Sequence, residues 1–249
     1  MIVLPLKSKH SFLKPKKIID EPTIHSKKLI KSVKENTFFN PDSPNYEKVY
    51  EFAMLAVNAA INAQEIQGFS ICEPPGHHAG IDFLGGFCYF NNIAEAVIQS
   101  KLKTLIIDID GHHGNGTQNI FENNKDVFFI SLHSSPNYPG TGLSSKNNIL
   151  NCPLSRDCGE EIYLKTLKEA IKQALKKFLP EQIAVSAGFD TYMSDLASLG
   201  LKKNSYEKIA KIIKDTKDKI NSKIFIVLEG GYSKELGELI HEFIRGFKD

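Results

Sequence analysis

The residues best suited to chemistry lie in one stretch, residues 104–117, which begins as an apolar run and ends in acids, imidazoles and glycines. Within it Asp108, Asp110 and His112 occupy alternate positions, so their side chains share one side while the backbone stays extended. Two carboxylates and an imidazole are suitable ligands for a divalent metal ion. The spacing therefore predicts a metal site. The alternative is that the aspartates cap the next turn and that His112 is a hydrogen-bonded core histidine.

Four other apolar runs also end in residues that can transfer protons or bind metal. They lead to His77 and His78, to His133, to Asp190 and to Tyr232. In open α/β sheets the ligand site lies beyond the carboxyl ends of the strands. We therefore expect these side chains to gather along one edge of a sheet.

Strand and helix patterns alternate along most of the chain. The predicted strands are residues 69–72, 105–109, 127–132, 183–187 and 224–228. The predicted helices are residues 46–64, 93–102, 118–122, 161–178, 205–220 and 234–247. This alternation predicts an α/β fold, an open and mostly parallel β-sheet with helices on both faces.

The composition limits the class of protein. No linker or block of like charge divides the 249 residues, so we expect one domain over residues 1–249. The net charge of +2 argues against a nucleic-acid partner. No apolar run has the length of a membrane span, and the first one is too short for a signal peptide. These features predict a cytoplasmic protein without a membrane partner.

The remaining features are consistent with such a protein. Residues 1–45 carry the least pattern and are interpreted as an N-terminal rim whose lysines, Lys7 and Lys9 among them, are solvated. Four cysteines are too sparse for a disulfide framework. Cys72 and Cys88 have apolar or aromatic neighbours and are expected to be buried, reduced thiols.

Six motifs in series resemble the zinc-dependent histone deacetylase family of the arginase/deacetylase superfamily. Asn115 and the Glu-Gly-Gly-Tyr motif are closer to its class II and bacterial acetylpolyamine or acetoin-utilisation branch. The motifs are residues 75–79 (Pro-Gly-His-His-Ala), 86–91 (Gly-Phe-Cys-Tyr-Phe-Asn), 108–117 (Asp-Ile-Asp-Gly-His-His-Gly-Asn-Gly-Thr), 131–133 (Ser-Leu-His), 186–190 (Ser-Ala-Gly-Phe-Asp) and 228–232 (Leu-Glu-Gly-Gly-Tyr). A single motif of this kind would be weak evidence, but six in family order are specific.

The resemblance implies that Asp110, His112 and Asp190 bind zinc, with Fe²⁺ as the alternative metal. Three protein ligands with an open fourth position are typical of a catalytic zinc site. It also implies a structural potassium ion bound mainly by backbone atoms. The residues around that ion would be Asp108, Asp110, His112, Ser131 and Leu132.

The paired histidines match the family's acid–base residues. The resemblance implies that His78 is the general base and acid, and that His77, oriented by Asp108, gives electrostatic support. The family often has Asp where this chain has Asn115. Because a neutral amide raises a neighbouring pKa less than a carboxylate does, we predict a largely neutral His78 near pH 7. His113 and His133 are expected to be structural.

The substrate side of the site is implied in the same way. Tyr232 matches the tyrosine that hydrogen-bonds the acyl carbonyl. Phe87 and Tyr138 match aromatic walls of the channel for an aliphatic side chain, and Gly86 belongs to the same motif. Asp42 matches a rim aspartate that binds substrate, although Asp-x-Pro is also a common turn sequence.

The implied function is that of a metal-dependent amidohydrolase, which uses zinc-activated water to remove acetyl or short acyl groups from acylated lysine or similar amines. One alternative is a deacetylase of acetylpolyamines or other small amides. The polyamine subtype with an acid seven residues after the last metal ligand is not favoured, since that position is Ala197. Two rival functions are a non-enzymatic acyl-lysine binder and an arginase-like enzyme, but we find no second acidic cluster for the two metals of the latter. The sequence does not indicate an oligomeric state.

Overall fold

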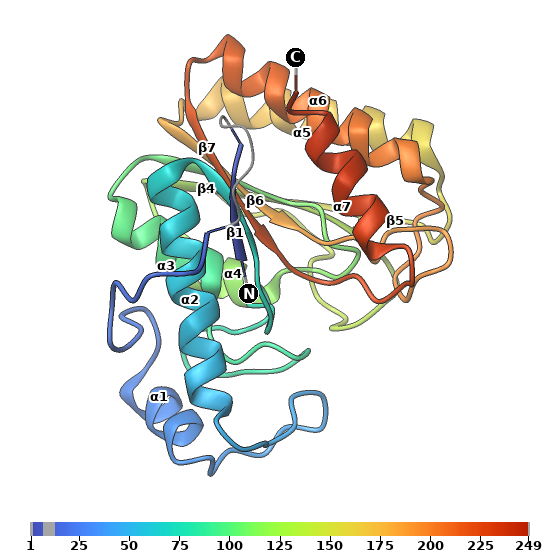
Figure 1. Ribbon diagram of the computed structural model, residues 1–249. Coiled ribbons are helices and arrows are strands. Elements are labelled where there is room, and N and C mark those ends of the chain that lie inside the picture. The colour runs from blue at the N-terminus through green and yellow to red at the C-terminus, as the bar shows by residue number, and fades with distance from the viewer. Residues whose placement is uncertain (1, 7–12, 249) are drawn as a thin grey trace.

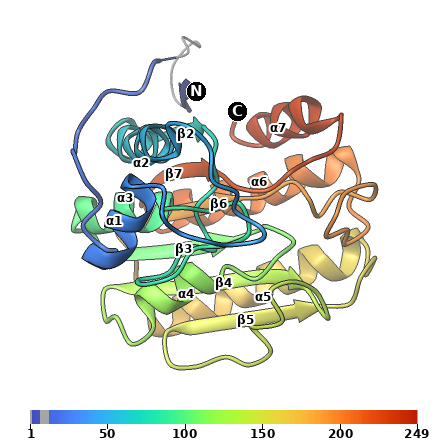
Figure 2. The same ribbon diagram turned by 90° about the horizontal axis from the view of Figure 1, so that it is seen from below.

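One sheet of seven strands organises the part of the chain that the structure describes, residues 2–6 and 13–248. In this computed structural model the strand order is β1-β2-β7-β6-β3-β4-β5, with β1 antiparallel and all other pairs parallel (Figures 1 and 2). The strands are β1 (Ile2–Pro5), β2 (Gly68–Ile71), β3 (Thr104–Asp108), β4 (Val127–Ser134), β5 (Ile149–Leu154), β6 (Gln182–Ala187) and β7 (Lys223–Leu228). The predicted mostly parallel sheet is confirmed.

Helices cover both faces of this sheet (Figure 1). They are α1 (Lys27–Lys34), α2 (Val49–Ile66), α3 (Asn92–Ser100), α4 (Asn115–Phe121), α5 (Glu160–Lys177), α6 (Lys203–Lys219) and α7 (Leu236–Arg245). The first four pack on one face and the last three on the other. None of the described helices has the length and hydrophobicity needed to cross a membrane.

The apolar strands follow from this three-layer arrangement, because each strand contributes side chains to two cores. On β3, Ile106 belongs to the core under α2 and α3, while Leu105 and Ile107 belong to the core under α5, α6 and α7. A strand buried on both faces is apolar at consecutive positions. This explains why β3 lacks the alternation of a half-exposed strand.

Three elements were not predicted: β1, β5 and α1. The interpretation of residues 1–45 as a rim is wrong for β1, where Val3 is buried and faces Ser70 of β2 across the antiparallel pair. A four-residue edge strand is too short to show a pattern, and its partner is far away in the sequence. β5 contains Asn151 and Pro153, which are unfavourable in strands and hide its pattern. Lys7 and Lys9 lie outside the described residues.

The N-terminal segment before α1 is attached to the helical layer by polar side chains. Asn58 of α2 accepts hydrogen bonds from the backbone N–H groups of Ile18 and Ile19. Glu95 of α3 accepts hydrogen bonds from the backbone and the hydroxyl of Thr23. These buried acceptors therefore hold an extended segment whose described pairing with the sheet is one bridge, between Leu13 and Val3 of β1.

The strand order has a switch point between β3 and β6. From β3 the chain continues to β4 and β5 on one side, then crosses through α5 to β6 and β7 on the other. Ligand sites of open α/β sheets lie at the carboxyl ends of the strands at such a point. The loops that follow β3 and β6 contain Asp110, His112 and Asp190.

Substitution of Phe243 in α7 tests how the helices support the edge of the sheet that carries Asp190. The buried ring of Phe243 packs edge-on against Phe189, the neighbour of Asp190, with ring centroids 5.8 Å apart. We expect Phe243→Ala to lower the free energy of unfolding by about 3–5 kcal/mol, because it leaves a cavity. Phe39, whose side chain is 94% exposed, provides the control. Phe39→Ala should change the free energy of unfolding by less than about 0.5 kcal/mol. Urea unfolding measures the free energy of unfolding of both variants. Similar losses in Phe243→Ala and Phe39→Ala would contradict a supporting role of Phe243.

Candidate active site

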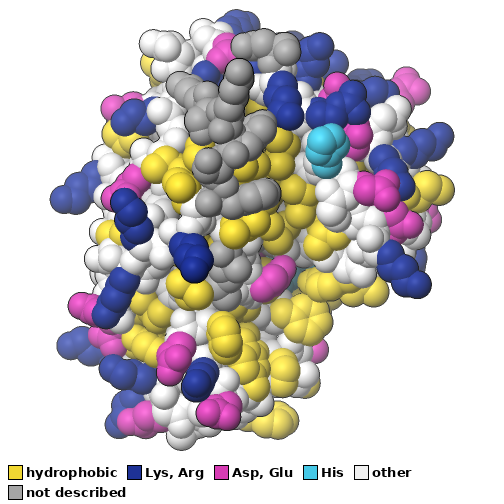
Figure 3. Space-filling model, viewed as in Figure 1, with side chains coloured by type: hydrophobic (Ala, Val, Ile, Leu, Met, Phe, Trp, Pro, Cys, Tyr) yellow, Lys and Arg dark blue, Asp and Glu magenta, His cyan; other side chains and the backbone are white. Residues whose placement is uncertain are grey.

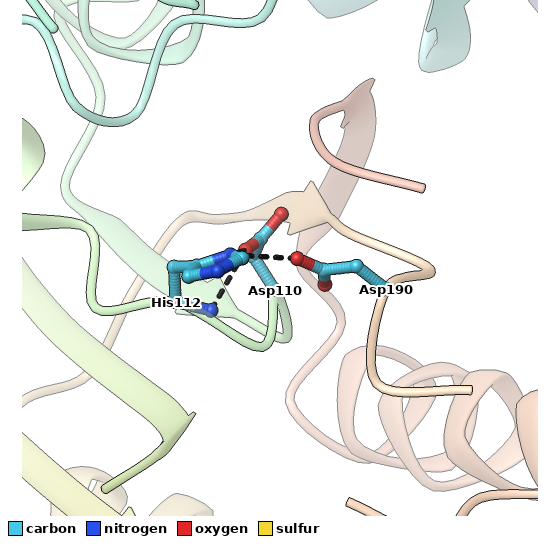
Figure 4. Close-up of side chains that lie close together, drawn as sticks. All are labelled: Asp110, His112 and Asp190. Carbon is cyan, nitrogen blue, oxygen red and sulfur yellow. Dashed lines mark hydrogen bonds and ion pairs between the residues drawn. The ribbon is translucent and has the colours of Figure 1, made fainter. Parts of the chain in front are cut away.

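Asp110, His112 and Asp190 come together at the switch point, as Figure 4 shows. His112 Nδ1 lies 2.7 Å from Asp190 Oδ2 and 3.3 Å from Asp110 Oδ1. One ligand atom from each residue lies within 4.8 Å of the others. Both aspartates are buried. The three side chains that the sequence predicts as metal ligands are thus neighbours.

The donor atoms of this cluster fit a divalent metal ion. Asp190 Oδ2 makes no hydrogen bond to any described residue, and its short contact with His112 lacks hydrogen-bond geometry. Its other oxygen accepts the backbone N–H of Gly111, and Asp110 Oδ2 accepts that of Gly230. Although burial opposes it, the close approach of the two carboxylates raises the pKa of His112 to about 10, because their charges favour a cation at this point.

Two glycines allow the neighbouring loops to approach the Asp110 carboxylate. A Cβ atom on Gly188 would lie 2.2 Å from Asp110 Oδ2, and one on Gly230 would lie 2.7 Å from the same atom. Both positions therefore require glycine for steric reasons. The motifs Ser-Ala-Gly-Phe-Asp and Leu-Glu-Gly-Gly-Tyr thus carry packing requirements as well as functional side chains.

His77 is buried between two of the aspartates. Its Nδ1 lies 3.0 Å from Asp108 Oδ2, and its Nε2 lies 3.7 Å from Asp110 Oδ1. Burial opposes the charged imidazole, but the charges of Asp110 and Asp108 raise the pKa of His77 well above its ordinary value. The predicted orienting partner, Asp108, is therefore in contact with His77.

His78 lies beside His77, with ring centroids 4.0 Å apart. Its Nδ1 donates to Asn115 Oδ1 at 2.7 Å, which leaves Nε2 as a proton acceptor. Burial and then the charge of His77 lower the pKa of His78 well below its ordinary value, so the imidazole is neutral at pH 7. Gly86 packs on this ring, since a Cβ atom there would lie 2.4 Å from His78 Cδ2.

Half-exposed aromatic rings lie around this buried centre. The ring of Phe87 is 5.8 Å from that of Tyr232, and the ring of Tyr138 is 5.1 Å from that of His78. Burial and the charges of Asp110 and Asp190 raise the pKa of Tyr232, so its phenol stays protonated and can donate. Asp42 is exposed, and its backbone carbonyl accepts the N–H of Phe87 at 3.1 Å.

Two acids that position site residues were not singled out from the sequence. Glu229 is buried, and its Oε2 accepts the backbone N–H groups of Gly76 and His77. Asp195 Oδ2 accepts the N–H groups of Tyr232 and Ser233. Glu229 lies within the motif of residues 228–232, and Asp195 lies shortly after the motif of residues 186–190. Their positioning roles have no further signal in the sequence, because both acids bind the backbone of another part of the chain.

The residues predicted around potassium lie at the adjoining ends of β3 and β4. Asp108 of β3 pairs directly with Ser131 of β4, and Leu132 is the next residue of β4 after Ser131. His133 lies within β4, not after it as predicted, and its Nδ1 bonds to the hydroxyl of Ser131. Both ring nitrogens of His113 are also hydrogen-bonded, to Thr141 and Gln118. His113 and His133 therefore have structural partners.

The comparison with known families agrees with this geometry. A family model described as the histone deacetylase domain matches residues 9–246. The chain belongs to the histone deacetylase family. This confirms the resemblance drawn from the six motifs.

Individual members show how similar the chain is to other histone deacetylase family proteins. A probable deacetylase of Archaeoglobus fulgidus is 37% identical over 75% of this chain and 58% of its own length. Acetylpolyamine amidohydrolase 2 of Pseudomonas aeruginosa is 35% identical over 84% of this chain and 66% of its own. The crystal structure of the HDA15 HD domain matches with a TM-score of 0.83 and 29% identity, over 91% of this chain and 73% of that one. The chain thus spans less than two thirds of the length of these two curated relatives.

Metal affinity tests the assigned ligands. Zn²⁺ titrated into the metal-free chain should bind with a stoichiometry of about one, and not as the pair of a two-metal site. We expect Asp190→Asn to weaken binding at least about 100-fold, since a charged ligand is lost. Asp126→Asn changes an exposed aspartate and should bind like the wild type. Equal affinity of the two variants, measured by calorimetry, would exclude Asp190 as a ligand.

Proposed function

We propose that this histone deacetylase family protein is a metal-dependent amidohydrolase that removes acetyl or short acyl groups from acylated amines, such as acyl-lysine or an acylated polyamine. The observation that carries the proposal is the position of His78. A neutral, buried imidazole with a free Nε2 lies beside the cluster of Asp110, His112 and Asp190. Tyr232, a hydrogen-bond donor, borders the same site.

Asp110, His112 and Asp190 are the residues that would hold the metal, Zn²⁺ or alternatively Fe²⁺. Bound there, the ion would lower the pKa of a water molecule and polarise the acyl carbonyl. Asp108, Ser131 and Leu132, with Asp110 and His112, remain the proposed surroundings of a structural potassium ion.

The two histidines have different roles in the reaction. His78 Nε2 accepts a proton from the attacking water and later returns it to the leaving amine. His77, kept protonated by Asp108 and Asp110, supplies positive charge beside the developing oxyanion. Because that charge also lowers the pKa of His78, the pair begins the reaction with one charged and one neutral ring.

Tyr232 donates a hydrogen bond to the acyl oxygen as negative charge develops on it. Asp195 holds its backbone N–H, and Gly230 in the same loop donates to Asp110, so the loop is fixed on both sides. Phe87 and Tyr138 would enclose the methylene chain of the substrate and exclude water from it. Asp42 stays a proposed contact for the substrate at the rim.

Two observations weigh against the rival functions. A non-enzymatic binder of acylated lysine has no need of a buried imidazole with a lowered pKa beside a metal cluster. A two-metal, arginase-like enzyme needs further ligands, whereas the described residues contain one such cluster of acids, histidines or cysteines. Relatives named deacetylase and acetylpolyamine amidohydrolase support the general activity.

Loss of the base should slow hydrolysis strongly. With Zn²⁺ present, the wild-type chain is expected to hydrolyse a fluorogenic acetyl-lysine amide. In His78→Ala the rate should fall about 10²–10⁴-fold, because the general base is lost. His241→Ala removes an exposed histidine of α7 and should retain the wild-type rate. If His78→Ala matched the wild type, the proposed mechanism would be wrong.

The pH dependence tests the role of Asn115. His78 must be neutral to accept a proton. Activity therefore falls when the pH drops below the pKa of His78 and the imidazole becomes protonated. Asn115→Asp keeps the hydrogen bond and adds a negative charge, which raises the pKa of His78. The acidic limb of kcat/KM should therefore move to higher pH by about 1 unit or more, measured between about pH 5 and 9. An unchanged profile would count against His78 as the base.

A further inference from the structure

A hollow in the surface lies directly beside the aromatic rim of the site. It has a volume of about 460 Å³ and is bordered by four aromatic rings, three prolines and one charged residue, Glu73. The segments that form it are the start of α2, the loop before α2 and the loop after β2. Hydrophobic side chains gather on this part of the surface, over the lower half of α2 and beside it (Figure 3).

The hollow and the rim of the site share Phe87. The ring of this residue borders the hollow, and its centroid lies 5.8 Å from that of the Tyr232 ring. Glu73 is near enough to Tyr232 for its charge to contribute to the raised pKa of that phenol. A molecule whose acyl end lies at Tyr232 can therefore reach the hollow with its other end.

Glu73 is a carboxylate without a cationic partner. Solvent reaches its side chain, yet no described residue donates a hydrogen bond to it or forms an ion pair with it. Burial by the surrounding walls, and then the charges of Glu229 and Asp110, raise the pKa of Glu73 to about 8. A cation in the hollow would oppose each of these effects and favour the charged carboxylate.

The aromatic rings of the hollow are also suited to a cation. Tyr46 lies 6.3 Å from Phe52 and 6.0 Å from Tyr89, measured between ring centroids, and Tyr46, Phe52 and Phe87 are half-exposed. Exposed aromatic faces attract ammonium groups through their π electrons. Glu73 supplies the formal negative charge that the rings lack.

Three of the eight residues that line the hollow offer no backbone donor to a peptide. Pro44, Pro74 and Pro75 have no N–H to donate to peptide carbonyl groups. A chain of methylene groups carrying an ammonium needs no such donors and can pack against prolines and rings. The lining therefore favours an alkylamine over a peptide.

We propose that the hollow beside Phe87 binds the free ammonium group of an acylated polyamine whose acylated end lies in the active site. The proposal rests on the proposed function and specifies its substrate class. One polyamine-specific subtype has an acid at the position that Ala197 occupies in this chain. The proposal assigns the negative charge that binds the polyamine to a different residue. Ala197 is buried against Gly111, and the negative charge comes instead from Glu73 on another loop.

Two matched substrates test the proposal, a monoacetylated diamine and the N-alkyl acetamide of the same length, which lacks the amine. Assays of the metal-loaded chain at about pH 8.5 keep the amine protonated and Glu73 largely ionised. The wild type should prefer the diamine in kcat/KM by about 10-fold or more, and Glu73→Gln should reduce this ratio about 10-fold. Tyr46→Leu should reduce it a few-fold. Glu161→Gln, an exposed glutamate of α5, should keep the wild-type ratio.

An unchanged ratio in Glu73→Gln would overturn the proposal. So would a wild type that prefers an acetyl-lysine peptide over the diamine and loses that preference in Glu73→Gln, because the hollow would then serve a peptide. A second measurement separates these results from failure of the proposed function. Calorimetry with spermidine should show binding about 10-fold weaker in Glu73→Gln than in the wild type. If the wild type hydrolyses none of the acetylated substrates, the proposed function fails. The proposal for the hollow is then decided by calorimetry alone, and equal spermidine affinities of the wild type and Glu73→Gln would reject it.

Discussion

The burial of several carboxylates at one sheet edge is the constraint on which the rest of the structure depends. Asp108, Asp110, Asp190 and Glu229 are all buried. Unpaired charges of this kind are too costly to bury, so each needs hydrogen bonds or a cation. His77 and His112 lie in contact with the aspartates, and backbone N–H groups donate hydrogen bonds to them. The arrangement around His112 suits a divalent ion, which would compensate the negative charge that is left.

This requirement explains the shape of the surrounding loops. An N–H can reach Asp110 only if Gly188 and Gly230 leave room beside its carboxylate. Glu229, itself bonded to the backbone of Gly76 and His77, connects the loop after β7 to the histidine pair. The acids therefore position the loops of the candidate site, and the loops in turn supply hydrogen bonds to the acids.

The sequence was sufficient for the parts of the structure that depend on local pattern. β3, β6 and β7 are apolar because they are buried on both faces, and their ends carry the motifs that identified Asp110, His112 and Asp190. The helices α5 and α6 were visible from one apolar stripe each. Their observed bounds differ from the predicted ones by one or two residues.

What the sequence did not reveal depends on contacts between distant segments. β1 is a strand only because β2 offers a free edge, and no feature of residues 2–5 specifies that partner. Asp195 and Glu229 matter through backbone groups that they reach in the folded chain. Glu73 stands next to two prolines in a turn-like sequence, and its isolation among aromatic rings exists only once α2 is packed.

The positions of the clustered residues along the chain have a consequence for its synthesis. Asp110 and His112 precede the crossover from β5 to β6, while Asp190 and Gly230 follow it. A nascent chain on the ribosome therefore carries Asp110 and His112 without Asp190 until the loop after β6 has emerged, and Asp110 Oδ2 lacks the N–H of Gly230 until β7 has emerged. The cluster of Asp110, His112 and Asp190 is therefore completed only as the last strands are added to the sheet, and a polypeptide released before β6 would lack it.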